Sequence, residues 1–244
     1  MESLNSSVTK TETENTFSFM DGVRDCIPTL LGYISIGIAM GVVGISSGLT
    51  VIHVFLLAIF VYAGSAQFII CAMIASASPI SAIIMTTFIV NLRHFLLSSA
   101  LAPNFTQYSI WKNIGIGTLL TDESFGVAIT KVLKKRPITD TWMNGLNITA
   151  YIVWIISCTL GAYLGGWVPN PSTFGLDYAL TAMFIALLIL QLQTIESSKF
   201  KHYLLLILLM VICMVIFSTF LSGSLSVIIS TVVVATIGVV TDKS

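Results

Sequence analysis

Long apolar runs separated by short polar stretches dominate this chain from about residue 26 onward. About 20 consecutive apolar residues are enough for a helix to cross the hydrocarbon core of a bilayer. By this length the pattern predicts eight helical spans, with seven as the alternative because polar residues interrupt the fourth. The expected spans are residues 26–46, 51–75, 79–101, 113–132, 142–167, 176–194, 203–221 and 224–241.

The composition agrees with this pattern. Hydrophobic residues make up 56% of the chain and charged residues only 9%, whereas soluble domains carry about 25% charged residues. The predicted fold class is therefore an all-α polytopic membrane protein. Residues 1–16 are polar and lack the basic start and apolar core of a signal peptide. We expect them to form a disordered cytoplasmic tail ahead of a single transmembrane transport domain over residues 17–244.

The basic residues are distributed unevenly about the expected spans. With the N-terminus inside, Lys112 alone falls outside and Arg93 lies within the membrane. This bias follows the positive-inside rule and predicts that both termini are cytoplasmic. Nine of the eleven basic residues fall in cytoplasmic segments, namely Lys10, Arg24, Lys131, Lys134, Lys135, Arg136, Lys199, Lys201 and Lys243. The zero net charge excludes the basic footprint of a nucleic-acid-binding protein.

Polar residues occupy the middle of the second, third and fourth expected spans. The second contains the run Ala63-Gly64-Ser65-Ala66-Gln67-Phe68, the third contains Asn91, Arg93 and His94, and the fourth contains Asp122 and Glu123. An Arg at the centre of a spanning helix costs at least about 2.5 to 3.5 kcal/mol and usually faces a cavity or a partner. The three features lie at a similar depth, which favours a common site.

Each feature has two interpretations. Gly64, Ser65 and Ala66 form either a face for close helix packing or a break in the helix that offers free backbone groups to a substrate. Arg93 and Asp122 form either a structural ion pair or the two ends of a substrate site. His94 is either a hydrogen-bonded core residue or a proton carrier.

Three of these motifs, taken in order, resemble one known family. The runs Ala63-Gly64-Ser65-Ala66-Gln67-Phe68, Asn91-Leu92-Arg93-His94 and Thr121-Asp122-Glu123-Ser124-Phe125, after an entry segment Gly22-Val23-Arg24-Asp25-Cys26-Ile27-Pro28, resemble the AzlC family. Members are large subunits of bacterial branched-chain amino acid exporters. The resemblance implies export of valine, leucine or isoleucine across the cytoplasmic membrane together with a small AzlD-type membrane subunit. Ser65 stands where the family commonly has Ala.

An amino acid zwitterion needs donors for its carboxylate, an acceptor for its ammonium group and an apolar pocket. Backbone N–H groups at a break near Gly64 and the Arg93 guanidinium suit the carboxylate. Phe60, Phe68 and Ile89 are apolar candidates for the pocket. The predicted substrate-binding residues are Gly64, Ser65, Ala66, Gln67, Asn91, Arg93, Asp122 and Glu123. In the alternative of proton antiport, His94, Asp122 and Glu123 are the proton carriers.

Other classes of function find less support in the chain. It contains no HExxH zinc motif, and its four cysteines are not paired as CxxC. We therefore expect no enzymatic activity, metal or cofactor. A channel for a small polar solute is the closer alternative. A weak echo between Gly48-Leu49-Thr50 and Gly175-Leu176-Asp177 suggests a repeat with parallel halves.

Overall fold

The structure is a computed structural model that describes residues 18–167, 199–221 and 223–241, with isolated positions between 178 and 195. The chain divides into two compact units, Met1–Leu176 and Asp177–Ser244. The predicted tail at residues 1–16, most of the predicted span at 176–194 and the second half of the predicted repeat at Gly175-Leu176-Asp177 lie outside the described residues. Those three predictions stay predictions.

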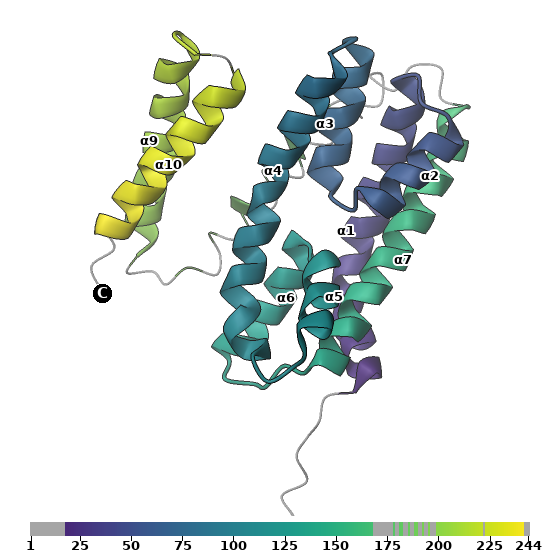
Figure 1. Cartoon of the computed structure of the whole chain (residues 1–244), viewed down its shortest axis with the longest axis vertical. Coiled ribbons are helices and arrows are strands. Elements are labelled where there is room, and N and C mark those ends of the chain that lie inside the picture. The colour runs from purple at the N-terminus through teal and green to yellow at the C-terminus, as the bar shows by residue number, and fades with distance from the viewer. Residues whose placement is uncertain are drawn as a thin grey trace, which may run out of the picture. The chain divides into compact units, whose positions relative to one another are not determined.

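Three long helices form the frame of the first unit: α1 (Phe19–Ser46), α4 (Ile80–Leu101) and α7 (Asp140–Gly165). Each has the length and apolar composition of a membrane span. Figure 1 shows α4 running along the length of the unit on the other side from α1 and α7. The predicted spans at 26–46, 79–101 and 142–167 correspond to these three helices.

Helices α1 and α7 pack backbone to backbone and run in the same direction. A Cβ atom on Gly22 would lie 2.0 Å from the carbonyl oxygen of Trp142, and one on Gly41 would lie 2.2 Å from that of Cys158. Only glycine permits an approach this close, and small residues at a helix interface allow it. The two contacts lie near opposite ends of α1, so the pair forms a continuous core for the unit.

Two helical hairpins complete this unit. Hairpin 1 consists of α2 (Val51–Phe60) and α3 (Gly64–Ala75), and hairpin 2 consists of α5 (Ile110–Thr118) and α6 (Asp122–Leu133). A short 3-10 turn (Ala102–Phe105) follows α4. The longest of these helices has 12 residues, which is about 18 Å of rise against a hydrocarbon core of about 30 Å.

Hairpin 1 lies against the C-terminal halves of the long helices. A Cβ on Gly44, near the end of α1, would lie 2.7 Å from Val54 of α2 and 3.9 Å from Cys71 of α3. Gly64, where α3 begins, faces Trp154 in the middle of α7. The chain therefore enters as α2, turns at mid-height and returns as α3 to the end from which it came (Figure 1).

Hairpin 2 lies against the opposite halves of the same helices. Lys112 of α5 pairs with Asp140 at the start of α7 at 2.5 Å, and Lys131 of α6 pairs with Asp25 near the start of α1 at 2.5 Å. The turn between α5 and α6 reaches Tyr33 in the middle of α1. The two hairpins thus approach each other from opposite ends (Figure 1).

The prediction of an all-helical protein is confirmed, but two predicted spans are wrong. Residues 51–75 and 113–132 do not form single helices, because each segment breaks and turns back at mid-height. The predicted break in the second segment is present, at residues 61–63, just ahead of Gly64. The break in the fourth segment, at residues 119–121, was not predicted.

The second unit contains α9 (Phe200–Ser218) and α10 (Gly223–Thr241), which match the predicted spans at 203–221 and 224–241. They are antiparallel, because Thr241 lies 3.4 Å from His202 and a Cβ on Gly238 would lie 3.2 Å from Leu206. Helix α9 is long and apolar enough to span a membrane.

Candidate functional site

The turn of hairpin 1 is held by the amide of Gln67. This side chain is fully buried and donates to the carbonyl oxygens of Leu57 at 2.9 Å and Val61 at 2.6 Å, at the end of α2. Its own oxygen accepts from Trp154 Nε1 at 3.2 Å. Both carbonyls also accept from the backbone, that of Leu57 from Val61 N at 2.9 Å and that of Val61 from Ala63 N at 2.7 Å. Gln67 therefore adds a second donor to each carbonyl and ties the end of α2 to α3 and to Trp154 of α7.

The first turn of α3 is open. Its N-cap residue is Ala63, which makes no side-chain hydrogen bond to the helix. The backbone N–H groups of Gly64, Ser65 and Ala66 are therefore left without the cap that a Ser, Thr or Asp would provide. Ser65 and Ala66 are both fully buried. An uncapped N-terminus inside the protein is a ready site for an anion, because its N–H groups and its dipole both favour negative charge.

The first turn of α6 is closed by its own side chains. Thr121 accepts from the backbone N–H of Ser124 at 3.2 Å, and Ser124 Oγ accepts in return from the backbone N–H of Thr121 at 2.9 Å. Asp122 and Glu123 follow the cap directly. Carboxylates in the first turn of a helix are stabilised by the helix dipole. This tip therefore supplies two carboxyl groups at mid-height.

Arg93 of α4 joins the two tips. Its Nη2 donates to Ser65 Oγ at 2.7 Å, at the start of α3, and lies 2.9 Å from Asp122 Oδ2, at the start of α6. The Arg93 and Asp122 side chains are 25% and 20% exposed. One guanidinium group thus bridges both hairpins where they meet, which explains how an arginine is tolerated in the middle of an apolar helix.

Two aromatic residues contact the hairpin tips from the side of α1 and α7. Tyr33 is 4% exposed, and its hydroxyl bonds Thr121 Oγ1 and donates to Glu123 Oε2 at 3.2 Å. Trp154 packs edge-on against Tyr33, with ring centroids 5.9 Å apart. Neither residue was predicted from the sequence, although buried Tyr and Trp usually need a hydrogen-bond partner. No spacing in the sequence indicates where that partner lies.

The structure brings most of the predicted site residues together. Gly64, Ser65 and Ala66 lie at one tip, Asp122 and Glu123 lie at the other, and Arg93 lies between them. Asn91 and His94, one turn apart on α4, are half-buried. Both amide hydrogens of Gln67 are engaged within hairpin 1, so its geometry is that of a support for the turn.

The apolar candidates differ in exposure. Phe60 is 78% exposed on α2, whereas Phe68 is 4% exposed within the core. That Phe60, Phe68 and Ile89 line a substrate pocket stays a prediction.

Long apolar helices, two hairpins and a charged centre where the hairpins meet define this protein as a polytopic helical membrane protein. The model of the family described as "AzlC protein" matches residues 28–168. The chain belongs to the AzlC family.

Several relatives resemble the chain over most of its length. It is 26% identical to the inner membrane protein YgaZ of Escherichia coli K12, over 74% of this chain and 76% of the relative. It is 26% identical to the branched-chain amino acid transport protein AzlC of Bacillus subtilis 168, over 68% and 64%. An uncharacterized membrane protein of Helicobacter pylori 26695 is 23% identical, over 75% and 79%. No solved structure matches the chain.

Proposed function

We propose that this chain is the large subunit of an exporter that moves valine, leucine or isoleucine across a bacterial cytoplasmic membrane. The branched-chain amino acid transport protein AzlC of B. subtilis, a relative at 26% identity, supports the substrate class. The relation to an inner membrane protein of E. coli supports the location. The exporter works with a small AzlD-type membrane subunit and exchanges its substrate for protons.

In the membrane, α1, α4 and α7 cross the bilayer, and the hairpins enter it from opposite faces without crossing. This topology keeps the Lys134 and Lys135 loop on the side of the N-terminus, as the eight-span count does. It moves Lys112, the exception in that count, to the same side, because α5 begins beside Asp140. The positive-inside rule therefore favours the topology with hairpins, with this side cytoplasmic.

The observation that carries the proposal is the bridge from Arg93 to Ser65 and Asp122. A zwitterion can insert into an ion pair without leaving either charge unpaired. Its carboxylate takes the place of Asp122 on the guanidinium, and its ammonium group takes the place of Arg93 on the carboxylate. Because breaking a buried pair by removing one partner is costly, an exchange that keeps every charge paired lowers the barrier to binding.

Each end of the amino acid has further partners at the hairpin tips. The carboxylate lies at the uncapped N-terminus of α3, within reach of the N–H groups of Gly64, Ser65 and Ala66. The ammonium group lies at the start of α6, between Asp122 and Glu123. Asn91, two residues before Arg93, adds a polar group from α4. The positive N-terminal dipole of α3 favours the carboxylate, whereas that of α6 disfavours a positive charge. The ammonium group therefore depends on the two acidic side chains.

Proton exchange uses the same carboxylates. A proton on Asp122 releases its hold on Arg93 and on the substrate ammonium group, so proton and substrate compete for one group. Glu123 follows Asp122 in the sequence and His94 follows Arg93, and these two residues complete a short relay. Competition of this kind couples the two movements because the site holds either the amino acid or the proton.

Counterflow distinguishes the exporter from a channel. Vesicles that contain this chain and its small subunit, loaded with unlabelled leucine, should accumulate labelled leucine transiently, and vesicles with the chain alone should not. A channel permits flux but no counterflow. Leucine flux without counterflow would contradict the carrier, and full activity of the chain alone would contradict the need for a small subunit.

A further inference from the structure

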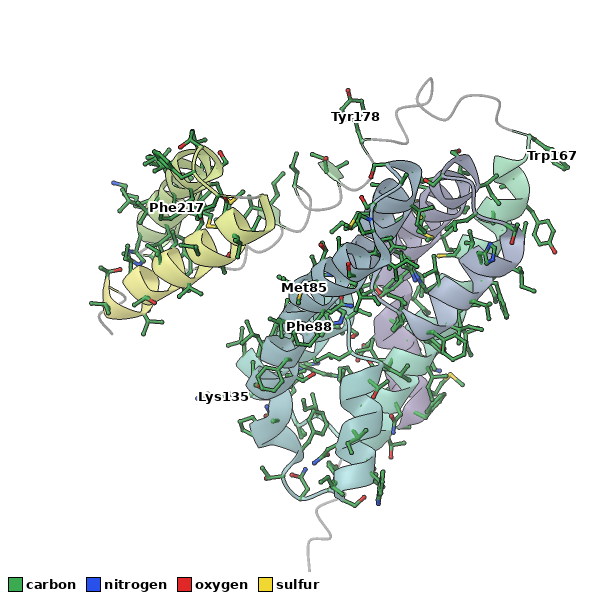
Figure 2. The ribbon with its side chains drawn as sticks, turned by 45° about the horizontal axis from the view of Figure 1, so that its top comes forward. Met85, Phe88, Lys135, Trp167, Tyr178 and Phe217 are labelled. Atoms are coloured by element: carbon green, nitrogen blue, oxygen red, sulfur yellow. The ribbon has the colours of Figure 1, made fainter. Side chains whose placement is uncertain are left out.

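A polar stripe runs along one face of α4. Thr87, Asn91, His94 and Ser98 follow one another at spacings of four, three and four residues, which places them on a single side of a helix. The neighbouring face is apolar and exposed: Met85 is 59% and Phe88 is 62% exposed, and both lie on the outer surface of α4 in Figure 2. The stripe itself is half-buried, and its last residue, Ser98, lies against hairpin 2, because a Cβ on Gly117 would be 3.5 Å from Ser98 Oγ.

Two atoms of this stripe lack partners. Thr87 Oγ1 and Asn91 Oδ1 are buried, and neither forms a hydrogen bond within the part of the chain that the structure describes. A buried polar group without a partner costs about 1 to 3 kcal/mol. Water or a polar solute passing along the stripe would supply the missing partners, whereas hydrocarbon would not.

A cavity continues the stripe beyond Arg93. It has a volume of about 230 Å³ and lies between the C-terminal half of α4 and hairpin 2, against Ser98, Phe105, Asn113, Gly117 and Leu120. One water occupies about 30 Å³ in the liquid, so the space is large enough for several waters or an aliphatic side chain. Asn113 contributes a buried Oδ1 that has no partner among the described residues. The lining is therefore mixed, with both apolar and polar groups.

The cavity and the unpartnered stripe atoms lie on opposite sides of the Arg93 bridge. Ser98 comes after Arg93 along α4, on the side of Lys112 and Asp140, and Thr87 comes before it, on the side of hairpin 1. Arg93, which bonds Ser65 and Asp122, lies between them along α4. Polar groups on both sides of a bridge that a substrate can open have the arrangement that a carrier requires.

We propose that the stripe of Thr87, Asn91, His94 and Ser98 is the path along which the amino acid moves, and that the cavity beside Ser98 receives its aliphatic side chain on the cytoplasmic side. The inference rests on the proposed function, because it takes a branched-chain amino acid as the solute. It adds Thr87, Ser98 and Asn113 to the residues that contact the substrate.

Matched single cysteines on α4 test the path. In a cysteine-free version of the chain, expressed with its small subunit, Ser98→Cys is compared with Ala100→Cys, which lies on the exposed face two residues away. Thr87→Cys is compared with Met85→Cys in the same way. A membrane-impermeant thiol reagent is applied from each side, with and without leucine. Because only the hydrated thiolate reacts readily, each stripe position should react at least about tenfold faster than its control.

The side of reaction and the effect of leucine complete the test. Ser98→Cys should react from the cytoplasmic side and Thr87→Cys from the other side, and leucine should slow both reactions. Equal rates at Ser98→Cys and Ala100→Cys would overturn the path. Leucine counterflow without any protection of the stripe would also overturn it. If the cysteine-free parent shows no leucine counterflow while its Ser98→Cys derivative still reacts, the proposed function is overturned instead, since the stripe would then be a path for another solute.

Discussion

The two hairpins have the same shape and different chemistry at their tips. Each consists of a short helix, a three-residue turn and a 12-residue helix, and each reaches the middle of α1 and α7 from its own end. Hairpin 1 has an uncapped second helix that begins with Gly64, Ser65 and Ala66, without a charge. Hairpin 2 has a capped second helix that carries Asp122 and Glu123.

This difference indicates a division of work. An N-terminus capped by its own side chains has satisfied N–H groups, so hairpin 2 offers carboxylates and little else. An uncapped N-terminus offers N–H groups and a positive dipole end, so hairpin 1 offers donors. Arg93 bonds to both tips and pairs with Asp122. One end of a zwitterion therefore suits each hairpin.

The largest effect is expected from the bridge between the hairpins. Arg93→Ala and Asp122→Ala should each reduce leucine transport by about 100-fold or more, because each removes one partner of a charge pair with the substrate, and truncating such a partner costs about 2 to 5 kcal/mol of binding. Because both side chains are partly exposed, the folded protein should survive in the membrane. The double variant should stay inactive, as counterflow and the amount of folded protein in detergent will show. Recovery of transport in the double variant would mean that the pair is structural.

Substitution of Gln67 tests whether hairpin 1 depends on the hydrogen bonds of this amide. Gln67→Leu removes two donors to helix-end carbonyls and the acceptor of Trp154, so we expect a loss of about 2 to 4 kcal/mol of stability, measured by thermal unfolding in detergent. Gln107→Leu is the matched control, because Gln107 is exposed and bonds only within its own turn. Equal effects of the two substitutions would show that the amide does not hold the break.

A single methyl group at the start of α3 should have a smaller effect. A Cβ on Gly64 would lie 3.0 Å from Trp154 Cη2, so Gly64→Ala should destabilise the tip by about 1 to 3 kcal/mol through overpacking and weaken leucine binding. Gly126→Ala, in α6, is the control, because a Cβ there meets nothing within 4 Å. Unfolding temperatures of the two variants compare the two hairpins directly. If Gly126→Ala is the more harmful, the contact with Trp154 does not limit the site.

The sequence predicted the long helices and the location of the site with fair success. Helix α4 was expected at 79–101 and is found at Ile80–Leu101. An uninterrupted apolar run of this length forms a single spanning helix in lipid. The polar residues of three segments were expected at one depth, and Arg93, Ser65 and Asp122 do meet. The cost of burying an arginine makes such a convergence predictable.

The hairpins could not be predicted from hydropathy, because an interrupted apolar segment that returns has the same length as one that crosses. A local signal did exist in the fourth segment. Thr121 and Ser124 stand three residues apart, as in a reciprocal cap at a helix start, which indicates that a new helix begins at Asp122. The contacts of Tyr33 with Thr121 and Glu123 join residues 88 and 90 apart, and no local pattern reveals them.

Sided labelling of the two loops beside α4 tests the account most directly. Single cysteines are placed at Ser76, after α3, and at Gln107, before α5, in a cysteine-free chain. Lys135→Cys and Trp167→Cys, at residues labelled in Figure 2, mark the cytoplasmic and the outer side respectively. They do so both in the topology with hairpins and in the eight-span topology. If the hairpins return without crossing, Ser76→Cys will label from outside with Trp167→Cys, and Gln107→Cys will label only from the cytoplasm with Lys135→Cys. The reverse pattern, with Ser76→Cys inside and Gln107→Cys outside, would restore the eight-span topology and contradict the account.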